Sequence, residues 1–342
     1  MLLAVAAGIL VVVLFISWLF WWPNTFSDPA ERTIYVSRGA SFRQVVDSLV
    51  TNGVIRSRWS FNATGRLLRL TGSIRYGKYS FTSGISNLGI LSDLKEGKSR
   101  VLISVTIPEG MRIEWIAHRF AQYVGIDSSK FVALATDSSI ARSAGVKATT
   151  LEGYLLPDTY AFHWETDERE ILDRMVDAFA RFYVDSLVRR QRELGLTLHE
   201  VLTLASIVEA EARLPRERAT IAGVYYNRLK KGMRLEADPT VQYAIPGGPR
   251  RLLYQDLRYP SPYNTYLIRG LPPGPIGNPG RGAILATLYP EKNGYLYFVA
   301  DGTGGHKFSR TYAEHLRAVR TYRRHMREIR RMRAFVPSDS KL

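Results

Sequence analysis

Cysteine is absent from this sequence of 342 residues. Its absence excludes disulfides, iron–sulfur clusters, thiolate zinc sites and cysteine nucleophiles. Histidine is scarce, with six residues that show no HExxH spacing, and neither a GxSxG elbow nor a Walker-type phosphate loop occurs. We therefore expect no metal and no cofactor, and the commonest zinc, serine and nucleotide-dependent chemistries are unsupported.

Acidic residues are in the minority. The chain has 47 Lys and Arg against 31 Asp and Glu, a formal net charge of +16, which favours an anionic partner. Residues 307–342 hold 11 basic and 3 acidic side chains, a net charge of +8, so half of the excess lies in the C-terminal tail. Because the charge is concentrated there, nucleic-acid binding is the weakest function that the composition suggests, and we expect no nucleic-acid partner.

Long apolar runs occur only once. Residues 1–22 carry no charged side chain and are long enough, at about 1.5 Å per residue, to cross a hydrocarbon core of about 30 Å. Trp18, Trp21 and Trp22 close the run, as in an interfacial aromatic belt. The run predicts one transmembrane helix. A cleaved signal peptide is the alternative, although the run exceeds a typical signal core. Residues 24–342 are then expected on one side of the membrane.

An internal repeat follows the apolar run. A strand-like segment at 33–36 precedes a helix that Ser41 would cap and Gly53 would end, and the pattern returns at 105–107 and 113–125. Small βα units of this kind resemble glycan-binding LysM modules, and a generic αβ packing unit is the alternative. Residues 79–103 indicate strands and turns, and 167–193 predict one long amphipathic helix.

A nearly all-apolar helix then carries two acids. Thr197 and Glu200 form a predicted capping box, and the helix runs to about Arg213. At about 100° per residue, Glu209 projects from an apolar stripe and Glu211 points the opposite way. A carboxyl group on an apolar face has a raised pKa and can act as a general acid near neutral pH. The alternative for Glu209 is a buried structural glutamate paired with an arginine.

The segments beyond this helix are rich in Gly, Pro, Asn and Tyr. Asp238 is expected to cap a short helix with proline at its first position. Loops at 261–266, 270–280 and 301–308 offer tyrosines and amides, which suit the walls of a carbohydrate cleft. His306, next to two glycines, is a candidate substrate contact. Solvated structural loops are the alternative.

Several motifs occur together and in one order: 151–160, 205–211, 227–229, 233–243, 263–266 and 304–308. Together they resemble the membrane-anchored endolytic murein transglycosylases, the MltG/YceG-like family. The resemblance implies an α+β fold and a single-pass protein of the bacterial inner membrane, with most of the chain on the periplasmic side. The implied parts are a transmembrane helix 1–22, a linker 23–32, a LysM-like subdomain 33–105, a catalytic region 106–316 with its core at 196–316, and a basic helix and tail 317–342.

The resemblance also implies the chemistry. A lytic transglycosylase (a lyase) cuts the MurNAc–GlcNAc β-1,4 bond of nascent peptidoglycan, leaves a 1,6-anhydroMurNAc end and so terminates glycan elongation. The family's catalytic glutamate falls on Glu209, which would act first as acid and then as base. The implied partners are peptidoglycan strands, the membrane and peptidoglycan synthases (penicillin-binding proteins). The residues implied to bind substrate are Glu211, Asp238, Thr240, Gln242, Tyr263, Asn264, Tyr266 and His306.

Two positions depart from the family pattern, with Glu236-Ala237 in place of the more usual Gln-Ser and Leu316 where Asn is frequent. Neither is the proposed acid. A membrane-tethered glycan-binding or scaffold protein of the cell-wall synthesis machinery, without catalysis, is the alternative function. In that case Glu209 would be only structural.

Overall fold

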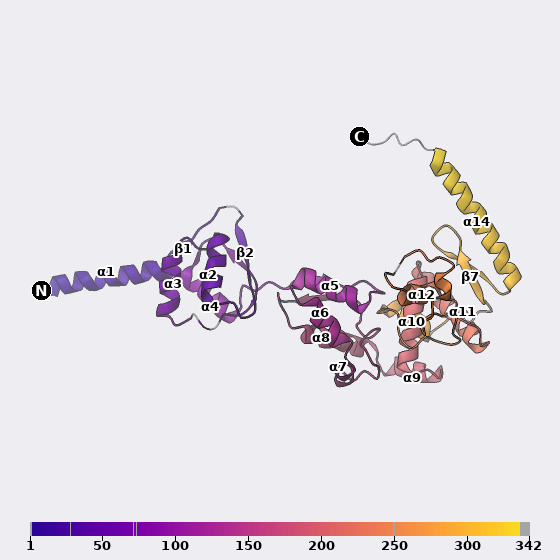
Figure 1. The fold of residues 1–342 in the computed structure, drawn as a ribbon. Helices are drawn as coiled ribbons and strands as arrows, with labels where there is room; N and C mark the ends of the chain where they lie inside the picture. Colours follow the sequence, from indigo (N-terminus) through magenta and orange to yellow (C-terminus); the bar gives the residue numbers. More distant parts are fainter. Residues whose placement is uncertain (1, 28, 71, 73, 249, 336–342) are drawn as a thin grey trace. The chain divides into compact units, whose positions relative to one another are not determined.

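A computed structural model describes residues 2–27, 29–70, 72, 74–248 and 250–335 (Figure 1). Helices and short antiparallel strand pairs are mixed along the chain, which confirms the α+β class. The chain divides into two compact units that alternate in sequence. The first contains Met1–Val105, His118–Ser128 and Thr159–Glu168, and the second contains the remaining segments.

The apolar run forms α1 (Leu2–Trp21). Among the described residues it is the one helix long and apolar enough to cross a membrane, over Leu3–Trp21, which fits the predicted single-pass anchor. The chain then enters β1 (Pro23–Asn24), which pairs antiparallel with β4 (Ile85–Ser86). The start of the segment expected as a linker is therefore hydrogen-bonded to the rest of its unit.

The first unit is built on β2 (Glu31–Val36), antiparallel to β3 (Gly77–Thr82). Between these strands lie α2 (Phe42–Thr51) and α3 (Arg58–Leu67). Ser41 caps α2 as expected, in a capping box with Gln44. The LysM-like identity of this β–α–α–β unit stays a prediction. Its core residues include Ile34, Val45, Leu49, Phe61, Tyr79, Phe81 and Leu94.

Two expectations about helices are wrong. The segment read as strands and turns also contains α4 (Asn87–Glu96), because Ser86 caps its start and Gly97 ends it at φ 76°. The single helix expected at 167–193 is two, α8 (Glu168–Phe182) and α9 (Asp185–Glu193). The backbone at Val184 is extended, and Tyr183 and Leu187 on either side of this break are both buried.

Two short strands and three helices lie between α4 and α8. β5 (Ile103–Thr106) pairs with β6 (Thr159–Phe162), and the helices are α5 (Ile113–Val124), α6 (Ser128–Ala135) and α7 (Ser138–Ser143). The second copy of the internal repeat thus also forms a strand and a helix, as its sequence predicts. Asn278 fastens the loop before α5 to the segment after α7, because its side chain bonds Met111, Glu152 and Gly153.

The second unit is organised around α10 (Leu198–Glu211), whose residues 201–208 are all buried. Thr197 and Glu200 form the expected capping box. The helix packs against α11 (Arg218–Lys230) and α13 (Arg281–Leu288), and it also contacts α12 (Asp238–Ala244). Short 3-10 turns occur at Pro215–Glu217 and Asp256–Arg258.

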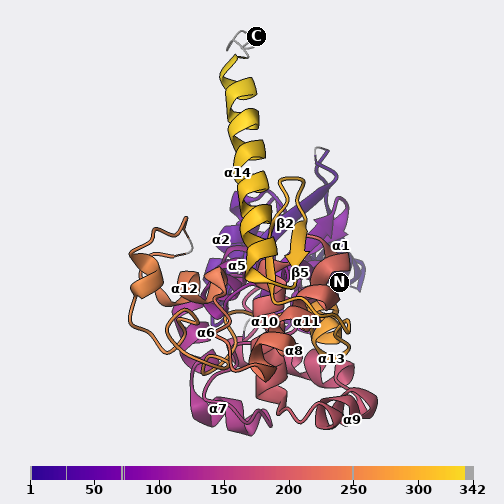
Figure 2. The ribbon, with the colours of Figure 1, turned by 90° about the vertical axis from the view of Figure 1, so that its right-hand side faces the viewer.

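The chain ends in a hairpin and a basic helix. β7 (Tyr297–Ala300) pairs antiparallel with β8 (His306–Ser309). α14 (Tyr312–Phe335) follows, contacts both strands of the hairpin and extends beyond it at its far end (Figure 2). The basic tail expected from residue 317 therefore begins within a helix, and its residues 336–342 lie outside the described part of the chain.

Candidate active site

The two acids at the end of α10 diverge, as the helical turn of about 100° per residue requires. Glu211 faces Tyr225 of α11, whose hydroxyl donates to the Glu211 Oε1 at 3.2 Å. Glu209 faces Arg218 and the backbone N–H of Gly280. The two carboxyl groups therefore occupy different environments and can have different roles.

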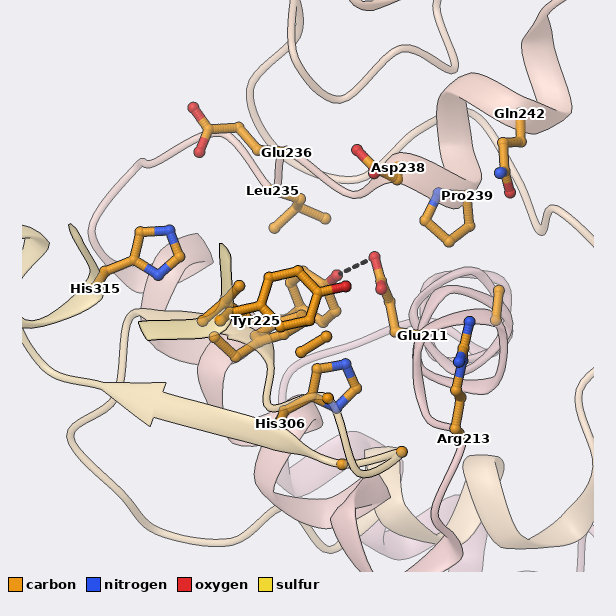
Figure 3. Close-up of a pocket in the computed structure, with 18 of the residues that line it drawn as sticks. Glu211, Arg213, Tyr225, Leu235, Glu236, Asp238, Pro239, Gln242, His306 and His315 are labelled. Carbon is orange, nitrogen blue, oxygen red and sulfur yellow. Dashed lines mark hydrogen bonds between the residues drawn. The ribbon is translucent and has the colours of Figure 1, made fainter. Parts of the chain in front are cut away.

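Glu211 opens into a cavity of about 640 Å³ (Figure 3). Figure 3 shows its carboxyl group between Asp238 and Pro239 on one side and His306 on the other. A space of this size lies within the range of small-ligand sites. Five of the nine residues expected from sequence line it: Glu211, Asp238, Gln242, Tyr266 and His306.

The pKa of Glu211 is raised to about 7. Burial is the main cause, the nearby charge of Asp238 raises the pKa further, and the hydrogen bond from Tyr225 lowers it. No Lys or Arg is within ion-pair distance of Glu211 among the described residues. The carboxyl group therefore holds a proton over part of the neutral pH range, which a general acid requires.

Glu209 is held by donors on both of its oxygens. The Arg218 Nη2 lies 2.8 Å from Oε1, and the Gly280 amide donates to Oε2 at 3.0 Å. Only 5% of the Glu209 side chain is exposed, and Arg218 also binds Glu109 at 2.7 Å. The pKa of Glu209 is raised overall, because burial and the charge of Glu109 raise it by more than the Gly280 amide and Arg218 lower it. This is the arrangement of the structural alternative, a buried glutamate paired with an arginine.

His306 enters the cavity from the start of β8 and is oriented by Glu217. The Nδ1 of the imidazole lies 2.7 Å from the Glu217 Oε2, and the His306 backbone N–H donates to Oε1 at 3.1 Å. A carboxylate at Nδ1 favours the tautomer with its proton on that nitrogen. Nε2 is then the ring nitrogen that a ligand in the cavity could use.

We predict that Glu217→Gln lowers kcat by about tenfold, because the amide holds the imidazole less firmly in this tautomer. His306→Ala should lower kcat at least as much, and the double variant should lose little more than His306→Ala alone. Steady-state kinetics measure all three variants. Additive losses would show that Glu217 does not act through His306.

Asp238 has a different role from the expected helix cap. α12 is capped by the backbone at Ala237, with Asp238 at the first helical position, because the Asp238 carboxylate is turned to the cavity. There its Oδ1 accepts a hydrogen bond of 2.6 Å from the Tyr266 hydroxyl. Burial and this bond raise the pKa of Tyr266, so the phenol stays protonated as a donor.

Asn264 and Thr240 support the loops that carry these side chains. Asn264 is fully buried, donates to the carbonyl oxygens of Leu257 and Tyr259, and accepts from the Tyr266 backbone N–H at 3.0 Å. The Thr240 hydroxyl is also buried and lies 2.8 Å from that of Thr265. Neither residue lines the cavity.

Tyr263, the last of the expected contacts, belongs to another cluster. Its ring packs on Tyr243 with centroids 4.8 Å apart, and Arg112 lies over the Tyr243 ring at 4.5 Å. Buried Glu152 lies near both phenols, and burial raises its own pKa to about 8. The Glu152 Oε1 accepts from the Asn278 side chain at 2.7 Å. The structure thus assigns Glu152 to a buried network rather than to the cavity.

Sequence reasoning missed several cavity residues. Tyr225 orients Glu211, and Arg228 binds Glu236 at 3.0 Å and the backbone of Leu235 at 2.9 Å. Glu236 has φ 50°, a left-handed conformation that is unfavourable for a side chain of this kind and that recurs at functional sites. The sequence feature that could have identified Glu236 is its position shortly before Asp238, where the sequence departs from the family pattern. No sequence feature indicated Glu217.

The fold and the cavity together describe an α+β protein with one N-terminal apolar helix that fits a membrane anchor and with a polar, carboxyl-lined cavity. The profile of the YceG-like family matches residues 34–321, so the chain belongs to that family. In the described residues, no group of three or more His, Asp or Glu side chains could hold a metal ion.

Similar proteins cover most of the chain. The endolytic murein transglycosylase of Bacillus subtilis (strain 168) is 32% identical over 327 residues, covering 89% of this chain and 90% of the relative. That of Streptococcus pneumoniae (strain R6) is 29% identical, with 84% of this chain and 58% of the relative covered. A 2.6 Å crystal structure of a YceG-like protein from Listeria monocytogenes has a TM-score of 0.61 and 32% identity, covering 84% of this chain and 98% of that one.

Proposed function

We propose that this protein is an endolytic lytic transglycosylase that cuts the MurNAc–GlcNAc β-1,4 bond of peptidoglycan strands, with Glu211 as its general acid and base. The observation that carries the proposal is a half-buried carboxyl group, with a pKa of about 7, opening into a polar cavity. The names of the similar proteins from Bacillus subtilis and Streptococcus pneumoniae support the same activity.

In the first step, protonated Glu211 donates its proton to the glycosidic oxygen. The bond between that oxygen and C1 of MurNAc breaks, the GlcNAc hydroxyl leaves, and positive charge develops on the MurNAc ring. Asp238 and Glu236 line the cavity and can stabilise this charge electrostatically. Tyr266, held on Asp238, and the imidazole of His306 are placed to bind the sugar hydroxyls.

In the second step, the Glu211 carboxylate takes the proton of the C6 hydroxyl of the same MurNAc. The C6 oxygen forms a bond to C1, which closes the 1,6-anhydro ring and restores protonated Glu211. Over the two steps one C–O and one O–H bond are broken, one of each is formed, and no water is consumed. A pKa near the working pH suits a group that must first lose and then regain a proton.

Glu211 is better suited than Glu209 to act as the acid. Sequence and family resemblance had favoured Glu209. Arg218 and the Gly280 amide donate to Glu209, and bonds to both oxygens favour its ionised form. Among the described residues, Tyr225 donates a hydrogen bond to Glu211, and Glu211 lines the cavity where Glu209 does not. We assign Glu209 a positioning role, holding Arg218 and the Gly280 loop.

Because of Asp238, hydrolysis is the competing reaction from which transglycosylation must be distinguished. Glu211, Glu236 and Asp238 all line the cavity, so a second carboxylate could also activate a water molecule, whereas sequence reasoning expected only one usable acid. Asp238 is engaged by Tyr266, whereas a base for water needs an oxygen turned to the water. The scaffold alternative would leave a glycan bound but uncut.

We further propose that the protein lies in the bacterial inner membrane through α1, with residues 24–342 on the outer, periplasmic side. Its place would be next to the peptidoglycan synthases, the penicillin-binding proteins, because a strand under synthesis is still close to the membrane. The apolar helix supports the anchoring. Cross-linking of the protein to a synthase in intact cells would test the partnership.

The proposed activity is tested by incubating the full-length protein in detergent with purified peptidoglycan strands. We expect fragments of intermediate length with 1,6-anhydroMurNAc ends, identified by mass. Cutting within a strand gives such fragments, whereas cutting from a strand end would release disaccharides one at a time. Reducing MurNAc ends would indicate hydrolysis. Binding without any cleavage would support the scaffold function.

We predict that kcat/KM for cleavage falls above about pH 7, tenfold per pH unit, because Glu211 is needed in its protonated form. The profile of Glu217→Gln should keep this limb, since that substitution does not touch Glu211. A rate that stays constant to pH 9 would contradict a general acid with the pKa of Glu211.

A further inference from the structure

We propose that α3 is a second membrane contact, which inserts Trp59 and Leu67 into the surface of an anionic lipid bilayer beside α1. The inference rests on the membrane anchoring proposed above. The partner is a phospholipid surface, recognised by apolar side chains and arginines together.

The end of α1 is fixed to the first unit rather than joined to it by a flexible segment. Leu19 is only 2% exposed, and its carbonyl oxygen accepts hydrogen bonds from Thr64 of α3 at 3.2 Å and from Asn87 of α4 at 3.1 Å. Both donors are buried. The last carbonyl groups of a helix lack partners within it, so these side chains take the place of water there.

Two further contacts hold the same junction. Asn24 is buried and donates to the carbonyl oxygen of Ile85 and to the side chain of Asn87, both at 3.1 Å. The β1–β4 pair adds backbone bonds at Pro23 and Asn24. The position of α1 in a bilayer therefore determines which face of this unit meets the lipid.

α3 carries an exposed tryptophan to the level of the bilayer. The Trp59 ring packs on Phe15 of α1, with centroids 6.2 Å apart, and is nevertheless 60% exposed. Phe15 precedes Trp21 by six residues, about 9 Å along the helix axis. If α1 spans the membrane, Trp59 lies beside it at a depth where its exposed face meets lipid rather than water.

The remainder of α3 has the charge and polarity of an interfacial helix. Leu67 is 64% exposed, and Arg66 lies seven residues after Trp59, on the same stripe of the helix. Residues 48–92 contain no Asp or Glu, and the part of them in and next to α3 carries Arg56, Arg58, Arg66 and Arg69, of which Arg58 pairs with Asp47. Arginines next to exposed apolar side chains are complementary to anionic headgroups over acyl chains.

The absence of cysteine allows a direct test on the full-length chain. Trp59→Cys and Leu67→Cys each carry a single nitroxide label, and the proteins are reconstituted in nanodiscs that contain phosphatidylglycerol. Ser37→Cys is the matched control, because it is exposed in the same unit and follows β2, which lies away from α1 in Figure 1. Val12→Cys reports on α1 itself, which is exposed at that position.

Collision of each label with oxygen and with a water-soluble nickel chelate is measured by electron paramagnetic resonance. We expect nickel collision at positions 59 and 67 to be about fivefold lower than at 37, with high oxygen collision, because lipid admits oxygen and excludes the chelate. Protection at 67 should weaken about twofold in phosphatidylcholine discs, which lack net charge.

Nickel collision at 59 and 67 equal to that at 37 would overturn the proposal. Low collision with both reagents would also overturn it, because it indicates contact with protein, such as a second copy of the chain. Protection that is equal in both lipids would overturn the role of the arginines. A label at position 12 that is not in lipid would show that the anchoring itself fails.

Discussion

Glu211→Gln should lower the release of anhydro-ended sugars by about a thousandfold, because the amide cannot donate the proton that the leaving oxygen needs.

The stability of the fold should not fall in this variant. The native state raises the pKa of Glu211 to about 7, so the folded protein loses stability, relative to the unfolded chain, as pH rises from about 4.5 to 7. The neutral amide has no such loss, and the variant should be more stable by about 3 kcal/mol at pH 8 and equally stable at pH 4.

Glu209→Gln is the matched control for this prediction, with the same substitution two residues away on the same helix. We expect it to keep cleavage within about tenfold of the parent, because the Gly280 amide and the cavity are preserved. Complete loss of cleavage in a folded Glu209→Gln, with activity retained in Glu211→Gln, would assign the acid to Glu209 instead.

Arg218→Met should destabilise the protein by about 3 kcal/mol, because it leaves a buried carboxylate without its cation while keeping the apolar stem. Only 15% of the Arg218 side chain and 5% of that of Glu209 are exposed, so water does little to replace the ion pair. Urea unfolding of the detergent-solubilised protein at pH 7 measures the loss.

The double variant Arg218→Met with Glu209→Gln separates the pair from the packing. Removing the unpaired charge should restore at least half of the lost stability, since the cost comes from the carboxylate and not from the missing arginine. Equal losses in the single and double variants would mean that the ion pair contributes nothing. In either variant the folded protein should still cleave, because Glu211 is untouched.

Local features of the fold could be predicted from sequence. The apolar run, the helix after Ser41 and the buried helix after Thr197 all depend on periodicity and on caps a few residues away, and the structure contains each of them. The break at Val184 could not be predicted, because the amphipathic pattern continues through it and only burial of Tyr183 and Leu187 distinguishes two helices from one.

The sequence allowed the side chains of the site to be predicted, but not the role of each side chain. Helical geometry already showed that Glu209 and Glu211 point apart. Which of them is the acid depends on Arg218, on Gly280 and on Tyr225, which lie 9 to 71 residues along the chain from the glutamates that they contact. Similarly, Asp238 has the sequence of a helix cap, and only the hydroxyl of Tyr266 explains why its side chain faces the cavity.

The most direct test of the central claim is to digest purified peptidoglycan with the full-length protein in water enriched in heavy oxygen. Attack by the C6 hydroxyl uses no water, so the new MurNAc ends should be anhydro rings without heavy oxygen. Heavy oxygen at C1 of reducing ends would instead show hydrolysis, and would contradict both the single-acid mechanism and the role that we give Asp238.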